Sequence, residues 1–115
     1  MKIMEYSGTM HSVHRGAIIA RPKLAYVKWA NANSLDGHAF SREYFHDEMA
    51  LVVLIPNSSL SIYGKMDVAA LWKGIFEEQL RRWNDNELCW PRERSLKIFH
   101  QWFSIENYSH VLDSE

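Results

Sequence analysis

Two cations stand where the chain could bind an anion. Arg21 and Lys23 flank Pro22 at the point where a strand is expected to end and a helix to begin. The free N–H groups of a helix start carry partial positive charge, so they favour an anion. Trp29 and Asn31 follow closely enough to border the same site. The pattern predicts an anionic ligand or an acidic partner peptide at this turn.

Arginines stand at a second predicted helix start. Arg92 and Arg94 fall in the first turn of a helix that we expect to begin at Pro91, which suits the first helical position. Positive side chains there oppose the helix dipole unless something negative compensates. Arg94 therefore joins the predicted anion or partner site. The structural alternative is a salt bridge from these basic residues to a carboxylate such as Glu106 or Asp113.

Other chemistry-bearing residues form no recognisable motif. His11 and His14 stand three apart, but no third ligand is identifiable near them. Residues 46–48 read His-Asp-Glu, but adjacent side chains point in different directions. Cys89, the single cysteine, has no sequence signature of a catalytic nucleophile near it. We expect it to be a small packed residue. The sequence contains no glycine-rich phosphate loop, nucleophile elbow or zincin motif. We expect no metal, no cofactor and no catalytic residue, although enzyme activity is left open.

Charge and apolar patterning exclude several classes of protein. The net charge is −1, with 13 basic and 14 acidic residues interspersed. A nucleic-acid-binding protein usually presents a basic face, so we expect no nucleic-acid partner. The longest apolar run, 49–56, is too short to span a bilayer. A single cysteine and an N-terminus without an apolar signal region favour a cytoplasmic protein.

The periodicity predicts an α+β fold in one domain, residues 1–115. Strands are expected over 16–21, 50–55 and 105–112, with 50–55 central because it is apolar on both faces. Residues 23–31 fit a helix or a strand, and uneven alternation favours a short helix. Residues 41–48 form a helical turn with Ser41 as its N-cap. Residues 1–14 form a mobile arm or a short edge strand.

The clearest predicted helix covers 67–83, with Asp67 as its N-cap. Its buried stripe comprises Val68, Leu71, Trp72, Ile75, Phe76, Leu80 and Trp83. Gly74 in mid-helix suggests a close crossing with another element. A second helix over 91–103, after a short link, should complete a helical hairpin. The order β-α-β-α-α-β predicts a three- to four-stranded sheet with helices on one face.

Two stretches of the chain are familiar together. One is Arg21-Pro22-Lys23 followed by Trp29-Ala30-Asn31. The other comprises Trp90-Pro91, Arg94, Phe99, Trp102-Phe103, Ser109, Val111 and Asp113. They resemble an uncharacterised family of small bacterial proteins with the motifs RPK…W.N and WP..R….F..WF…..S.V.D. The resemblance touches roughly a third of the chain. It implies a bacterial origin and a whole-chain single domain, and it implies no activity.

Aromatic density and low net charge favour a non-catalytic binding or protein-interaction domain. Trp29, Trp90 and Trp102 are the tryptophans that could lie partly exposed beside arginine, a combination typical of interfaces. We expect self-association as a homodimer, or a protein partner. The alternative is a small enzyme or ligand-binding domain that holds an anionic small molecule in a basic pocket. A deep pocket with convergent polar groups would distinguish the second from the first.

Overall fold

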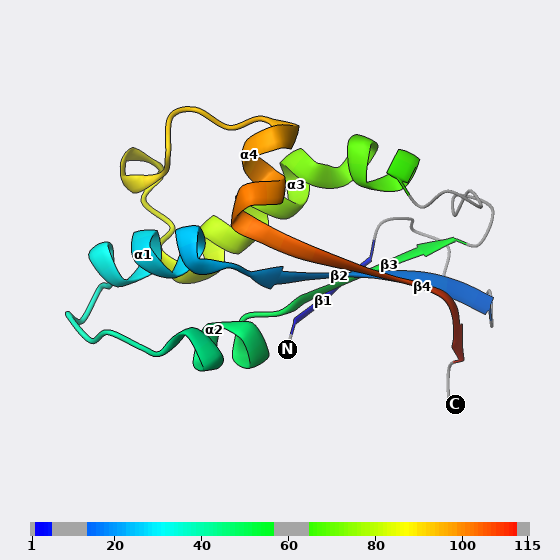
Figure 1. Cartoon of the computed structure of the whole chain (residues 1–115), viewed down its shortest axis with the longest axis horizontal. Helices are drawn as coiled ribbons and strands as arrows, with labels where there is room; N and C mark the ends of the chain where they lie inside the picture. The colour runs from blue at the N-terminus through cyan, green and yellow to red at the C-terminus, as the bar shows by residue number, and fades with distance from the viewer. Residues whose placement is uncertain (1, 6–13, 57–64, 113–115) are drawn as a thin grey trace.

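Four strands form one sheet in the order β1-β3-β2-β4. The computed structural model describes residues 2–5, 14–56 and 65–112 (Figure 1). The strands are β1 (Lys2–Glu5), β2 (His14–Pro22), β3 (Leu51–Pro56) and β4 (Phe103–Leu112). β1 runs parallel to β3, and the other neighbours are antiparallel. The predicted α+β class is confirmed, β3 is an inner strand as expected, and part of the N-terminal stretch is an edge strand.

Helices connect and cover the strands. They are α1 (Leu24–Ala32), α2 (Arg42–Glu48), α3 (Lys65–Trp83) and α4 (Leu96–Trp102), with a 3₁₀ turn η2 (Glu87–Cys89) between the last two. Figure 1 shows α3 and α4 stacked over one face of the sheet, with α1 and α2 at the end where β2 stops. The order is therefore β-β-α-α-β-α-α-β. Residues 57–64, which follow β3, lie outside the described residues.

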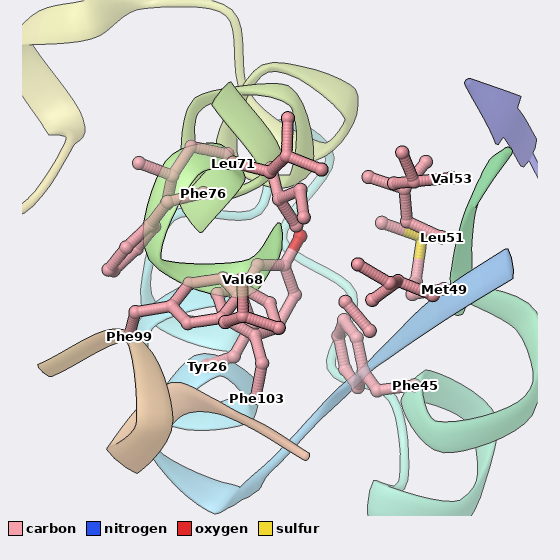
Figure 2. Packing of buried hydrophobic residues seen from close by; sticks show 14 of the residues in the cluster. Tyr26, Phe45, Met49, Leu51, Val53, Val68, Leu71, Phe76, Phe99 and Phe103 are labelled. Atoms are coloured by element: carbon pink, nitrogen blue, oxygen red, sulfur yellow. The ribbon is translucent and has the colours of Figure 1, made fainter. Parts of the chain in front are cut away.

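The core lies between the α3 and α4 layer and one face of the sheet. Ile18 is paired with Val53 and Ala20 with Leu51, and all four side chains are buried. Alternate side chains of a strand point to opposite faces, which places these four together under the helices. Rings from several elements complete this cluster (Figure 2), including Tyr26, Phe45, Phe76, Phe99 and Phe103. Large buried rings remove much apolar area from water and anchor a small core.

Residues 24–32 form a helix, as the uneven alternation favoured. Pro22 ends β2, since proline donates no ladder hydrogen bond. The next amide, Lys23 N–H, donates to the Trp102 carbonyl oxygen at 2.8 Å, and the Lys23 carbonyl accepts from Val27. This turn is thus tied to the end of α4. The Ser41 cap is also confirmed, because its Oγ accepts from Tyr44 N–H at 3.1 Å.

Two details of α3 differ from expectation. The helix begins at Lys65, so Asp67 lies inside it and is not its N-cap. Gly74 marks no close crossing, because a Cβ built there would meet no atom within 4 Å. The buried stripe is present, with Leu71, Ile75 and Leu80 all in the core. Periodicity therefore identified the buried face of the helix correctly. The predictions drawn from single residue types, an N-cap at Asp67 and a close crossing at Gly74, were wrong.

The start of α4 was predicted wrongly. The helix begins at Leu96, after Ser95, whose Oγ accepts from Ile98 N–H at 3.1 Å. The Ser95 hydroxyl accepts a hydrogen bond from a free N–H group in the first turn of the helix. The side chain of Pro91 has no acceptor that could do the same. Arg92 and Arg94 therefore precede the helix rather than lying in its first turn. Segment 84–95 replaces the predicted short link, so the two helices do not form the expected tight hairpin.

Tryptophan side chains hold segment 84–95 in place. Trp29 Nε1–H donates to the Cys89 carbonyl at 2.8 Å, and Trp90 Nε1–H donates to the Asn84 carbonyl at 2.8 Å. Asn84 Nδ2 in turn donates to the Asn33 carbonyl at 3.1 Å. Trp29 and Trp102 are partly exposed, as expected, and pack against the core, whereas Trp90 is buried.

Candidate anion-binding site

A hollow of about 370 Å³ lies between α3 and segment 84–95. Trp72 and Lys73 of α3 line one side, and Arg92 and Arg94 line the other. Three cations and one aromatic ring therefore surround a single depression. Among the residues that the structure describes, no acidic side chain lines it.

The periodicity of α3 explains the helical side of the hollow. Leu71 and Ile75 point into the core, so Trp72 lies half-buried at the border of the stripe and Lys73 lies exposed beyond it. Residues at i and i+1 point in directions about 100° apart on a helix. A bulky ring and a lysine at this border form the α3 side of the hollow.

Trp90 orders the arginine side of the hollow. Its buried ring lies under two guanidinium groups, with Arg94 Cζ 5.8 Å and Arg81 Cζ 5.6 Å from the ring centroid. Such cation–π contacts hold an arginine without neutralising it. Arg94 Nη1 also donates to the Pro91 carbonyl at 2.7 Å. Arg94 is therefore fixed in position, and no carboxylate of a described residue pairs with its charge.

Lys73 and Arg92 are free to bind. Neither makes a hydrogen bond or an ion pair with any residue in the described part of the chain, and both are exposed. Like charges that share a hollow repel one another, and an anion placed among them relieves that repulsion. Arg94 is held by its own contacts, so only Lys73 and Arg92 need to be ordered when an anion binds.

The hollow is half-open and close to the lower size limit of ligand pockets. A small molecule that bound there would keep much of its surface in water. A carboxylate group presented by a larger partner would be better shielded from water, because the partner itself would cover the open side of the hollow. The geometry favours the recognition of a charged group at a surface over the enclosure of a substrate.

The predicted site residue Arg21 lies elsewhere and is engaged. Its Nε donates to Glu106 Oε1 at 2.9 Å, and its Nη1 donates to the His46 carbonyl at 3.0 Å. The hydrogen bond from Arg21 holds the pKa of the Glu106 carboxyl below its usual range. This contact is the structural salt bridge to Glu106 that the sequence offered as the alternative to ligand binding.

The other predicted residues of this group also join segments. Lys23 Nζ donates to the His100 carbonyl at 2.9 Å, which ties the start of α1 to α4. The Asn31 amide exchanges two 3.0 Å hydrogen bonds with the backbone of Phe40. With Trp29 bound to Cys89, each of these side chains contacts a different element. No hydrogen bond, ion pair or ring contact between described residues joins Arg94 to the other four predicted residues.

Sequence reasoning found Arg94 and missed its neighbours in space. Trp72 was assigned to the core, and Lys73 was not singled out. Arg92 was noticed for its charge, but it was placed on a helix that begins later than predicted. The usable signal was the border of the apolar stripe, where a tryptophan next to a lysine marks the edge of the buried face.

Three comparisons, with family models, curated proteins and solved structures, found no match. The resemblance noted from the sequence therefore stays an expectation. Within the described residues, no group of three His, Cys, Asp or Glu side chains is placed to hold a metal ion. In the same part of the chain no helix has the length and apolar character to cross a membrane.

Proposed function

We propose that this protein is a non-catalytic binding domain that holds an acidic group of a partner protein in the hollow formed by Trp72, Lys73, Arg92 and Arg94. One observation carries the proposal: three cationic side chains converge on one depression, and no described carboxylate neutralises them. The buried ring of Trp90 positions one of the three without reducing its charge.

A protein partner is favoured over a small molecule for two reasons. The hollow is half-open, so a ligand held only there would remain wet. Leu88, in the same segment as both arginines, is 94% exposed. Arginine and tryptophan beside an exposed apolar side chain are typical of protein interfaces, where apolar contacts supplement charge recognition.

Calorimetric titration with a synthetic glutamate peptide tests the proposal. The wild type should bind this peptide at low ionic strength and lose affinity as salt rises, because exposed charge pairs are screened. The double variant K73Q/R92Q should bind about tenfold more weakly, since two exposed ion pairs together contribute about 1.4 kcal/mol. A lysine peptide of equal length should not bind.

The matched control is K28Q/R42Q. Lys28 of α1 and Arg42 of α2 are exposed and lie outside the hollow, and the pair changes the net charge by the same amount. Its affinity should stay within about twofold of the wild type when both variants are compared at about 0.15 M salt, because neither residue lines the hollow and salt screens charges that do not contact the ligand. Equal losses in both double variants would show a diffuse charge effect and contradict the proposed site. Binding of inorganic phosphate but not of the glutamate peptide would contradict the acidic protein partner.

A further inference from the structure

The two edges of the sheet are unequal. β1 has four residues, whereas β4 has ten. An edge strand presents a row of backbone N–H and C=O groups that can pair with another strand. Apart from Phe103 N–H, which donates to the Phe99 carbonyl at the end of α4, the backbone hydrogen bonds of β4 to described residues are those of its pairing with β2. The long edge is therefore open in the part of the chain that the structure describes.

The first part of β4 is regular enough to act as a template. Six consecutive residues, 103–108, pair with 17–22 of β2 without interruption. An irregularity in register follows, between the pairs made by Arg15 and Ala17. Bulges of this kind disturb an edge locally. Segment 103–108 is the stretch that keeps straight strand geometry.

Segment 103–108 lacks three of the usual protections against pairing, namely lysine, proline and a bulge. Natural edge strands often carry lysine or proline, and residues 103–112 contain neither. The one acidic residue in that range, Glu106, is paired with Arg21 at 2.9 Å and accepts from the Tyr108 hydroxyl at 3.1 Å. Its charge is thus compensated within the same chain. The net charge of −1 adds little repulsion between copies.

We propose that two copies of this chain pair through β4, antiparallel and around a two-fold axis, to form one continuous eight-stranded sheet. Such pairing is self-complementary, because each strand offers the other the same groups. A register centred on Ile105 places the two half-buried isoleucines side by side and sets Ser104 opposite Glu106 of the other copy. A register centred on Glu106 would oppose two carboxylates, which destabilises a strand pair.

Sedimentation velocity on the full chain over a micromolar concentration series tests this inference. The wild type should sediment as a dimer, and S104K/N107K should sediment as a monomer. Ser104 and Asn107 are exposed, and lysines there introduce the edge protection that β4 lacks. The control A32K/A39K adds the same charge at exposed positions outside the strands and should remain dimeric. K73Q/R92Q should remain dimeric too, because the hollow is a separate surface.

A cross-link provides an independent readout if the lysine variant fails to fold. Paired residues of antiparallel strands have Cα atoms about 4.5–5.5 Å apart, within disulfide range. C89S/I105C should therefore form a disulfide-linked dimer in mild oxidant, and C89S/A32C should not. A wild type that is monomeric throughout the series, or a dimer that survives S104K/N107K, would overturn the inference, as would equal cross-linking of both cysteine variants.

Discussion

Gln79 connects the two layers of the core through side-chain hydrogen bonds. It is fully buried on α3, and its Nε2 donates to the Met49 carbonyl at 2.6 Å. Its Oε1 accepts from Arg82 at 2.9 Å, and its own carbonyl accepts from the Tyr26 hydroxyl at 2.6 Å. Burial raises the pKa of Tyr26, which keeps that hydroxyl protonated as the donor. A buried amide with all these partners specifies how α3 docks on the strand ends.

Replacing Gln79 with leucine should lower the free energy of unfolding by about 1–3 kcal/mol, because the Met49 carbonyl would be left buried without its donor. Gln101→Leu, at an exposed position of α4, should change it by less than about 0.5 kcal/mol. Chemical denaturation at one fixed protein concentration measures both. Equal effects would mean that Gln79 contributes no more than a surface amide.

Sequence reasoning at the residue scale named a salt bridge to Glu106 as one of two alternatives for the cations of the predicted anion site, and Arg21 makes that contact. Local patterns could not decide between the alternatives, because the pairing depends on β2 and β4 being neighbours. Gln79 follows Ile75 by four residues on the same face of α3, but the predicted buried stripe did not include it. A polar side chain on an apolar stripe is a signal for a buried hydrogen-bond network, because burial without partners is costly.

Capping interactions determine where the short helices begin. Ser41 and Ser95 each accept a hydrogen bond from an amide in the first turn. The first cap was predicted, because it directly precedes an isolated helical turn. The second was missed, because Pro91 and two arginines also fit a helix start and local preferences did not decide between them. The error mattered for function, since it placed Arg92 and Arg94 on a helix instead of beside the hollow.

The two described glycines that matter for backbone shape should respond oppositely to alanine. Gly74 lies in α3 with open space around it, so Gly74→Ala should stabilise the fold by about 0.5–1 kcal/mol. Gly37 has φ of 78°, where a side chain is strained, so Gly37→Ala should destabilise it by about 1 kcal/mol. Thermal unfolding of both variants checks the signs. A lower melting temperature for Gly74→Ala would show that α3 is more crowded there than described.

The whole molecule combines a four-stranded sheet, in which β4 is an edge strand among the described residues, with a charged hollow on the helical side. Periodicity predicted the class, the main helix and the inner strand, because these depend on local burial patterns. It could not predict strand order, since β1 and β3 are joined only by tertiary pairing. Periodicity could not predict the hollow for the same reason. Lys73 and Arg92 come together only when segment 84–95 packs beside α3.

Indole resonances test the proposed acidic-group site most directly. In ¹⁵N-labelled wild-type protein, the five tryptophan side chains act as separate reporters. Addition of the glutamate peptide should shift the Trp72 indole signal most, because that ring lines the hollow and its N–H bonds no described residue. The signals of Trp29 and Trp83 should stay in place, since their N–H groups are bonded to the Cys89 and Ala30 carbonyls. A stationary Trp72 signal beside shifts at Trp29 or Trp83 would contradict the account.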